Sequence, residues 1–478
     1  MANAIFEVPQ AKNEPVLAYQ PGSPEKAALK EALAALKAAQ KELPMFIGGK
    51  RVVTENKISI HPPHEIAHTL GHYCKGDSSH VKQAIEAALQ AKANWENMPW
   101  QDRAAIFLKA ADLLSGPYRA RMNAATMLGQ SKNVYQAEID AVAELADFFR
   151  FNVQYMTEIY QQQPNSPKGT WNQLEYRALE GFVFAITPFN FTSIAGNLPG
   201  APALMGNTIV WKPAETQIYS AAVIMEIFEE AGLPAGVINL IYVDGPVAGD
   251  VIFDHPDFAG LHFTGSTKVF QHLWQVIGKN ISKYRSYPRI VGETGGKDFV
   301  IAHSSADPVQ VATALSRGAF EYQGQKCSAA SRAYLPQSLW EDIKCRLLED
   351  IESFKMGNPE DFTNFINAVI DERAFDKISG YIEQTKKDSA AEIIAGGKYD
   401  KSEGYFIQPT VILVKDPGYR TMCEEIFGPV LTIYVYKDQD FEKTLDLLDQ
   451  TSPYALTGAV FGKDREALIF ASEKLKHS

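Results

Sequence analysis

The sequence predicts a soluble α/β protein whose centre is a doubly wound parallel sheet. The chain is 478 residues long, with 46% hydrophobic and 22% charged residues, so we expect two or three domains rather than one core. Beyond Gly181, short apolar strands alternate with helical segments. This alternation is typical of a parallel sheet covered by helices, which binds ligands outside the carboxyl ends of its strands.

The first third of the chain is expected to be mostly helical. Residues 1–43 form an N-terminal extension with an Ala- and Lys-rich helix at Pro24–Glu42. Apolar residues at i, i+3 and i+4 predict helices throughout Asp77–Tyr160. Between these regions we expect two short β segments, near Met45–Val53 and Lys57–Ile60.

A segment rich in Pro, Asn, Ser and Gly at 161–169 ends the last of these helices, and Thr170–Leu179 is predicted to be a strand. The alternating units then begin. Their expected strands are Gly181–Thr187, Thr208–Lys212, Val237–Val243 and Leu261–Thr264, and their expected helices are Ile194–Met205, Gln217–Ala231 and Pro246–His255. A second α/β region runs from Phe299 to the end of the chain.

Composition excludes several classes of protein. A formal net charge of −11 offers no general attraction to phosphates, so nucleic acid is not expected as a partner. Four scattered Cys residues predict a reducing compartment rather than a disulfide framework. No apolar stretch approaches the length of a membrane span, and the N-terminus lacks the pattern of a secretory or mitochondrial targeting peptide. We therefore expect a cytoplasmic protein.

The residues that indicate chemistry most strongly are Cys327 and Glu293. Cys327 ends Gly-Gln-Lys-Cys at 324–327, and Glu293 opens Glu-Thr-Gly-Gly-Lys at 293–297. A thiolate can attack a carbonyl carbon, and a carboxylate can activate the water that releases the acyl product. A single Cys is more often a small buried hydrophobic residue, so it is the pairing that predicts covalent aldehyde oxidation.

Two predicted strands end in side chains suited to a carbonyl or a nucleotide. Asn190 follows the first strand, where its amide can stabilise an oxyanion or simply satisfy a turn. Lys212 is the last residue of the second strand, and Glu215 follows it. An acid there can bind a ribose hydroxyl and repel a 2′-phosphate, although a solvated loop pair has the same pattern.

Two further segments are weaker signals by themselves. Gly265 and Ser266 form a strand-to-helix junction whose backbone N–H groups suit a pyrophosphate. Glu425 precedes a Gly-Pro turn, where its carboxylate is suited to a second ribose or is merely solvated.

A stretch of metal-ligating residue types gives no metal site in our interpretation. The residues are His61, His64, His68, His72 and Cys74. Their spacing matches neither a zinc finger nor the H-E-x-x-H helix, and two Pro residues separate the first two His. A solvated β-hairpin near a sheet edge explains the stretch better, so no metal is expected.

Taken together, the motifs resemble the aldehyde dehydrogenase superfamily in order and approximate spacing, from about residue 45 to the end of the chain. The matching segments are Pro-Phe-Asn-Phe at 188–191, Trp-Lys-Pro-Ala-Glu at 211–215, Phe-Thr-Gly-Ser at 263–266, Glu-Thr-Gly-Gly-Lys at 293–297, Gly-Gln-Lys-Cys at 324–327 and Glu-Glu-Ile-Phe-Gly-Pro-Val at 424–430. Gln-Lys-Cys-Ser-Ala around Cys327 and Asn-Phe-Thr at 190–192 are similar to one branch, the Δ1-pyrroline-5-carboxylate dehydrogenases.

The resemblance implies a role for each matching residue. Cys327 would be the nucleophile, Asn190 with the Cys327 backbone N–H would form the oxyanion hole, and Glu293 would be the deacylation base. Ser328 would contact the substrate carboxylate and Glu144 would face the substrate. The residues that would hold NAD are Lys212, Glu215, Gly265, Ser266, Glu425 and Phe427. The implied reaction is NAD-dependent oxidation of L-glutamate γ-semialdehyde to L-glutamate in proline catabolism.

The resemblance also implies an architecture. We expect a Rossmann-type NAD-binding domain over 44–165 and 181–293, an oligomerisation β-flap over 166–180, and an α/β catalytic domain over 294–478. Members of the branch continue beyond the last residue of this chain, so the partner strand of the flap is expected to be absent. A homodimer or higher oligomer is expected where that segment is present.

Two alternatives stay open at this point. The first is another NAD-dependent semialdehyde or aliphatic aldehyde dehydrogenase with the same catalytic residues. The second is a catalytically impaired homologue that keeps the fold.

Overall fold

The computed structural model describes residues 6–454 and 456–476, and the chain divides into two compact units. The first unit consists of the chain up to His61, His68–Gln130 and Val134–Glu293. The second consists of Pro62–Ala67, Ser131–Asn133 and the chain from Thr294 onward. In the described part of the chain, no helix combines the length and apolar character needed to cross a bilayer.

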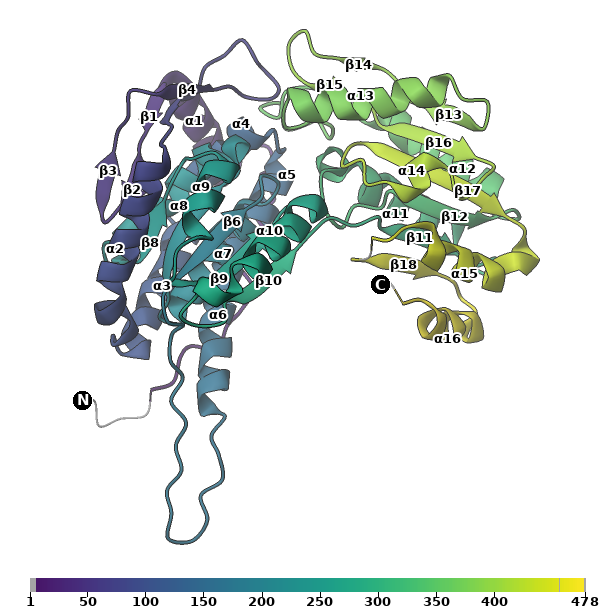
Figure 1. The fold of residues 1–478 in the computed structure, drawn as a ribbon. Coiled ribbons are helices and arrows are strands. Elements are labelled where there is room, and N and C mark those ends of the chain that lie inside the picture. Colours follow the sequence, from purple (N-terminus) through teal and green to yellow (C-terminus); the bar gives the residue numbers. More distant parts are fainter. Residues whose placement is uncertain (1–5, 455, 477–478) are drawn as a thin grey trace. The chain divides into compact units, whose positions relative to one another are not determined.

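A seven-stranded sheet forms the centre of the first unit (Figure 1). Its strands are β2 (Met45–Ile47), β3 (Lys50–Val52), β6 (Phe182–Thr187), β7 (Thr208–Pro213), β8 (Ile238–Leu240), β9 (Phe258–Thr264) and β10 (Arg289–Glu293). The order is β10-β9-β6-β7-β8-β2-β3, parallel from β10 to β8 and antiparallel beyond. After β6 the chain adds β7 and β8 on one side of β6, and then adds β9 and β10 on the other side. Sheets of this kind bind ligands where the strand order reverses, which here is the carboxyl end of β6.

Helices connect these strands as the alternation after Gly181 predicted. They are α7 (Thr192–Leu204), α8 (Ile218–Ala231), α9 (Gly245–Ile252) and α10 (Thr267–Lys279). α8 ends at Gly232, whose φ of +99° suits a residue without a Cβ. The parallel strands are apolar runs; in β6 every residue but one is buried, as expected for a sheet covered on both faces.

The earlier part of the chain is helical, as predicted. Its helices are α1 (Pro24–Ala38), α2 (Ser78–Glu96), α3 (Trp100–Ser115), α4 (Arg119–Gln130), α5 (Val134–Ala137) and α6 (Glu144–Gln161). Between α5 and α6 a π-helix spans Glu138–Ala143. The sequence pattern did not distinguish this π-helix from the α-helices around it.

The second unit contains a six-stranded sheet in the order β13-β16-β17-β12-β11-β18. Its strands are β11 (Phe299–Ala302), β12 (Arg332–Pro336), β13 (Ala391–Ala395), β16 (Thr410–Val414), β17 (Val430–Tyr436) and β18 (Gly458–Phe461), and its helices are α11 (Pro308–Phe320), α12 (Trp340–Ser353), α13 (Glu372–Lys386), α14 (Arg420–Cys423), α15 (Phe441–Thr451) and α16 (Arg465–Lys474). Phe299 and Ile301 belong to one hydrophobic cluster, whereas Val300 and Ala302 belong to another. Successive residues of one strand therefore face two cores, which confirms a second α/β region.

The predicted strand at Thr170–Leu179 is wrong. Residues 162–179 contain neither helix nor strand, and Figure 1 shows them as two long arms next to α6. A strand needs a neighbour for its backbone N–H and C=O groups, and no described strand lies beside this one. The arms are instead joined through side chains: the Leu174 backbone N–H donates to Gln163 Oε1 (2.8 Å), and that of Asn172 donates to Ser166 Oγ (3.0 Å).

The stretch of His and Cys residues is only partly the solvated hairpin that we predicted. β4 (Lys57–Ile60) and β5 (Gly71–Cys74) do pair antiparallel, and β1 (Lys41–Leu43), predicted as the end of a helix, joins them. His64 and Cys74, however, are buried. His64 Nδ1 bonds to Ser131 Oγ (3.1 Å), and His68 Nε2 bonds to the Lys37 carbonyl (2.9 Å). These rings are engaged by protein atoms, and the described residues contain no grouping of three ligands suited to a metal ion.

Candidate active site

Four predicted site residues lie at the carboxyl ends of neighbouring strands in the first unit. Asn190 follows β6, Gly265 and Ser266 follow β9, and Glu293 is the last residue of β10. The ladder between β9 and β10 sets Glu293 opposite Thr264, and the Gly265 N–H donates to the Glu293 carbonyl (3.2 Å). The sheet therefore brings these residues to one edge.

Residues next to Asn190 in the chain belong to a buried polar network. Asn190 itself has an exposed fraction of 4%. Gln130 Nε2 donates to the carbonyl of the preceding Phe189 (2.5 Å), while Gln130 Oε1 accepts from the hydroxyls of Thr192 (3.0 Å) and Ser220 (2.9 Å). Sequence reasoning missed this network because its members lie on α4, α7 and α8, and buried polar residues carry no periodic signal.

Glu144 lies close to the same loop. It is the first residue of α6, directly after the π-helix, and its Oε2 accepts a hydrogen bond from Ser193 Oγ (2.6 Å). Ser193 is in the first turn of α7, which begins just after Asn190. The structure thus places Glu144 beside the helix that follows the proposed oxyanion donor.

Lys212 and Glu215 line a narrow crevice at the end of β7. Its other walls come from Tyr73, Lys75, Pro213, Ile218, Tyr242, Val243 and Asp244. Burial lowers the pKa of Lys212, while the carboxylates of Glu215 and Asp244 act in the opposite direction. Lys75 pairs with Asp244 (2.8 Å). The crevice therefore contains two cations and two acids, of which Glu215 is exposed.

The junction after β9 has the geometry of an anion site. α10 begins at Thr267, and Ser266 caps it by accepting a hydrogen bond from the Val269 N–H (3.4 Å). The first N–H groups of a helix lack partners within the helix and carry a partial positive charge. Together with the crevice at β7, this junction fits the phosphates and ribose of a dinucleotide.

In the second unit, Cys327 lies in a turn shortly after the kinked, irregular segment Glu321–Gly324. It is half-buried and forms no disulfide. Three consecutive residues before it have positive φ: Tyr322 (51°), Gln323 (55°) and Gly324 (65°). For the two non-Gly residues this conformation costs free energy, and such strain persists only where surrounding contacts enforce it.

Buried amide side chains provide those contacts. Gln323 Nε2 donates to the Ala368 carbonyl (2.9 Å), and Gln323 Oε1 accepts from the Asn367 N–H (3.0 Å). Gln325 Oε1 accepts from the Ile370 N–H (2.9 Å). Both Gln side chains are fully buried. The loop that carries Cys327 is therefore fastened on both sides of Gly324.

Glycines in the neighbouring segments permit close backbone approach. A Cβ at Gly296 would lie 2.7 Å from the Cys327 carbonyl oxygen, and a Cβ at Gly324 would lie 2.3 Å from that of Gly428. The Gly296 N–H also donates to Glu425 Oε1 (3.1 Å). Burial raises the pKa of Glu425, although this N–H acts against the rise. Sequence reasoning missed that Gly296 allows this close approach to Cys327 and donates to Glu425. The pair Gly295-Gly296 in the sequence could have indicated it.

The remaining two predicted residues lie near these segments of the second unit. Ser328 is exposed, follows Cys327, and lines a cavity of about 180 Å³ with residues that include Asp298, Thr457 and Phe461. Phe427 has a φ of 62° and lines a crevice with Glu425 and Gly324.

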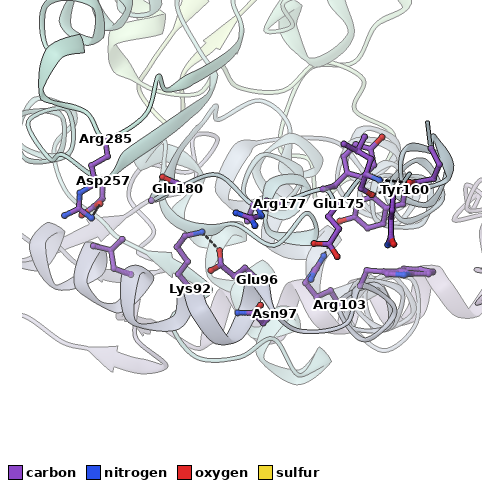
Figure 2. Close-up of a pocket in the computed structure, with 18 residues that line it drawn as sticks. Lys92, Glu96, Asn97, Arg103, Tyr160, Glu175, Arg177, Glu180, Asp257 and Arg285 are labelled. Carbon is purple, nitrogen blue, oxygen red and sulfur yellow. Dashed lines mark hydrogen bonds and ion pairs between the residues drawn. The ribbon is translucent and has the colours of Figure 1, made fainter. Parts of the chain in front are cut away.

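A cavity of about 1010 Å³ lies elsewhere in the first unit, and none of the predicted residues lines it. Figure 2 shows its walls, which come from α2, α3, the end of α6 and residues 173–181. Several of its charged groups already have protein partners: Lys92 pairs with Glu96 (2.5 Å), Arg285 pairs with Asp257 (2.7 Å), and Arg103 Nε donates to the Leu204 carbonyl (3.0 Å). It adjoins the amino ends of β6 and β9, whereas the predicted site residues lie at the carboxyl ends of these strands.

Comparisons with known proteins agree with this geometry. The profile of the aldehyde dehydrogenase family matches residues 52–478. A Delta-1-pyrroline-5-carboxylate dehydrogenase of Agaricus bisporus is 52% identical over 479 residues, covering 99% of this chain and 87% of the relative. The human mitochondrial Delta-1-pyrroline-5-carboxylate dehydrogenase is 48% identical over 467 residues, covering 98% and 83%. The crystal structure of the Mycobacterium tuberculosis Delta-pyrroline-5-carboxylate dehydrogenase bound with NAD superimposes with a TM-score of 0.95 at 52% identity, covering 99% of this chain and 87% of that one.

Proposed function

Because the chain belongs to the aldehyde dehydrogenase family, we propose that it oxidises L-glutamate γ-semialdehyde, the open form of Δ1-pyrroline-5-carboxylate, to L-glutamate with NAD⁺. The observation that carries this proposal is similarity along 99% of the chain to proteins that bear the dehydrogenase name. The strained, anchored loop around Cys327 supports the same chemistry.

Cys327 is the proposed nucleophile. Its thiolate adds to the aldehyde carbon, a C–S bond forms, and the carbonyl oxygen becomes an oxyanion. The three left-handed residues before it restrict the loop, and their anchors keep the thiol in one place. A fixed nucleophile loses little freedom on reaching the transition state.

Asn190 is assigned to stabilise the oxyanion, and Glu293 is assigned to the hydrolysis of the thioester. The Asn190 amide, which lies in a loop that Gln130 bonds at Phe189 and Thr192, donates to the oxyanion. After the hydride has left, a thioester remains on Cys327. Glu293 then takes a proton from water as the water oxygen attacks the acyl carbon, and the C–S bond breaks to release the carboxylate and the thiolate.

The cofactor proposed is NAD, which accepts the hydride when bound. Lys212 and Glu215 hold a ribose, and Gly265 with Ser266 at the start of α10 receive the phosphates. Glu425 and Phe427 are assigned to the nicotinamide half. Glu425 is already oriented by the Gly296 N–H.

Ser328 and Glu144 are the proposed determinants of substrate choice. Ser328 follows the nucleophile and is exposed, so its hydroxyl is available to the substrate carboxylate. Glu144 is next to Ser193 at the start of α7. An acid there suits the substrate ammonium group.

The test compares NADH formation from Δ1-pyrroline-5-carboxylate and from hexanal. We expect kcat/KM to be at least about tenfold higher for the semialdehyde, since a site that pairs polar substrate groups rejects analogues that lack them. Cys327→Ala should abolish turnover, whereas Cys345→Ala, an exposed thiol on α12, should leave it unchanged.

Each contrary result of this test has a defined meaning. Equal kcat/KM values would indicate a general aliphatic aldehyde dehydrogenase. No turnover of either aldehyde, in a folded protein, would indicate an impaired homologue.

Location and assembly are also proposals. We propose a cytoplasmic location, which the absence of a disulfide among the four Cys residues supports; some relatives are named mitochondrial. We propose that the arms at 162–179, where Trp171 is 86% exposed, take part in a homodimer or higher oligomer when the C-terminal segment of the branch is present. Sedimentation velocity on a chain extended by that segment, with and without Trp171→Ser, measures this, and a monomeric extended chain would contradict it.

A further inference from the structure

The N-terminal segment, residues 6–20, forms neither helix nor strand, yet it is bound to one face of α6. The Glu14 N–H donates to Asp147 Oδ1 (2.6 Å), Arg150 donates to Glu14 Oε2 (2.7 Å), and the Ala11 N–H donates to Gln154 Oε1 (3.0 Å). These α6 residues are spaced three and four apart, so they lie on one side of the helix. The segment therefore runs along α6 in a defined register.

The segment continues to a fully buried carboxylate, that of Glu138. Glu138 accepts hydrogen bonds from the Leu17 N–H (2.9 Å), the Tyr19 hydroxyl (2.7 Å) and Asn123 Nδ2 (2.8 Å), and it pairs with Arg119. A buried charge is tolerated only when it is paired and fully hydrogen-bonded. Two of these donors, on Leu17 and Tyr19, come from the N-terminal segment.

Glu138 is also the first residue of the π-helix. The turn ends at Glu144, whose N–H bonds to the Ile139 carbonyl, five residues earlier. A π-turn is rare because an ordinary α-turn is more stable, and it is frequently associated with functional sites. A contact from outside the helix must therefore stabilise the π-turn here. The hydrogen bonds that Leu17 and Tyr19 donate to Glu138 are such contacts, and they fix the first residue of the turn.

The other end of the π-turn is at the proposed substrate site. Glu144 accepts from Ser193 Oγ (2.6 Å) in the first turn of α7, and Asn190 lies just before that helix. A shift of one residue in the helical register would rotate Glu144 by about 100° around the axis and break its bond to Ser193. The register of this turn and the position of Glu144 are thus linked.

We propose that residues 11–19 act through Glu138 as a positioning element for the substrate-binding end of α6. The segment fixes the π-helical register, and the register aims Glu144 at the substrate. This inference rests on the proposed function in assigning Glu144 to the substrate. The N-terminal segment would then help to determine which aldehyde the enzyme accepts, in addition to stabilising the fold.

A double-mutant cycle tests the proposal. Glu138→Gln should raise KM for the semialdehyde about fivefold and leave KM for NAD⁺ within about twofold. In the Glu144→Gln background, Glu138→Gln should have no further effect on the aldehyde KM, because its action passes through Glu144. Gln154→Ala, which removes the bonds to Ala11 and Glu158 but none to Glu138, is the matched control and should behave like the parent. Additive effects of the two substitutions, or equal changes in both KM values, would overturn the proposal.

Hydrogen exchange provides a second test, which uses a mild substitution and needs no substrate. Tyr19→Phe removes a single donor to Glu138, and hydrogen exchange should then become faster at residues 138–144 while α8 is unchanged. Unchanged exchange at 138–144 would overturn the proposal. If the parent chain fails to oxidise the semialdehyde, the proposed function falls. The exchange experiment still decides whether the segment holds the π-turn.

Discussion

At the scale of single residues, we predict that the preference for NAD over NADP depends on Glu215. It is exposed at the mouth of the crevice that also contains Lys212 and Lys75. A carboxylate there repels a 2′-phosphate and accepts from a 2′-hydroxyl. Glu215→Gln should therefore raise the ratio of kcat/KM for NADP⁺ to that for NAD⁺ by about tenfold. Glu86→Gln, an exposed acid on α2, controls for the change in net charge. An unchanged ratio would remove Glu215 from the cofactor site.

Lys297 gives the protein a predicted pH dependence of stability. The side chain is 1% exposed, and its Nζ has no hydrogen-bond partner among the described residues. Burial, together with the nearby Arg332, lowers its pKa from 10.5 to about 7, against the attraction of Glu425 and Asp298. Between pH 7 and 10.5 the unfolded chain therefore binds more protons at this residue, and the free energy of unfolding rises with pH.

Lys297→Met should consequently stabilise the protein, and more at pH 6 than at pH 9. Below pH 7 the parent chain bears the full cost of the buried charge, at most about 5 kcal/mol. Thermal unfolding of both proteins at the two pH values measures the difference, with Lys268→Met, an exposed lysine on α10, as control. An equal change in Tm at both pH values would contradict the account.

Sequence reasoning proposed individual site residues more readily than the residues that hold their loops. Cys327 and Glu293 were proposed because their residue types are reactive and their motifs contain glycines. Gln130 and Gln323 were not, since a buried amide that fastens a loop looks like any polar residue until its distant partners are known. The contacts by which they fasten these loops exist only in the folded chain.

At the scale of elements, the loop that carries Cys327 requires glycine at Gly324. Its φ is +65°, and an added Cβ would lie 2.3 Å from the Gly428 carbonyl oxygen. Gly324→Ala should lower the free energy of unfolding by about 2 kcal/mol or more and reduce kcat. Gly380→Ala in α13 is the matched control, because a Cβ there meets open space. It should be neutral or stabilising by about 1 kcal/mol. Calorimetry and steady-state kinetics on both variants measure this, and equal behaviour would contradict the role of the loop.

The elements that followed from local pattern were predicted, and those that depend on distant contacts were not. β6 and β7 are apolar runs bounded by turn residues, so their assignment needed no tertiary information. Thr170–Leu179 has strand-forming residues but no described neighbour, and it forms no strand. The π-helix at Glu138–Ala143 has an ordinary helical sequence, and its register is linked to Leu17 and Tyr19 far away in the chain.

At the scale of the whole molecule, two α/β units share the residues assigned to one reaction. Asn190 and Glu293 belong to the first unit and Cys327 to the second. The central claim is that aldehyde oxidation passes through a thioester on Cys327 that Glu293 resolves. Cys327 and Glu293 come from different units, so the claim can be tested only on a chain that contains both units.

The most direct test follows a single turnover of Glu293→Ala with Δ1-pyrroline-5-carboxylate and NAD⁺, quenched and analysed by peptide mass spectrometry. The account predicts a burst of NADH close to one per chain, an acyl adduct on the peptide containing Cys327, and a slow steady state, because the thioester forms but water is not activated. An undiminished steady-state rate without a burst, or an adduct on another cysteine, would contradict it.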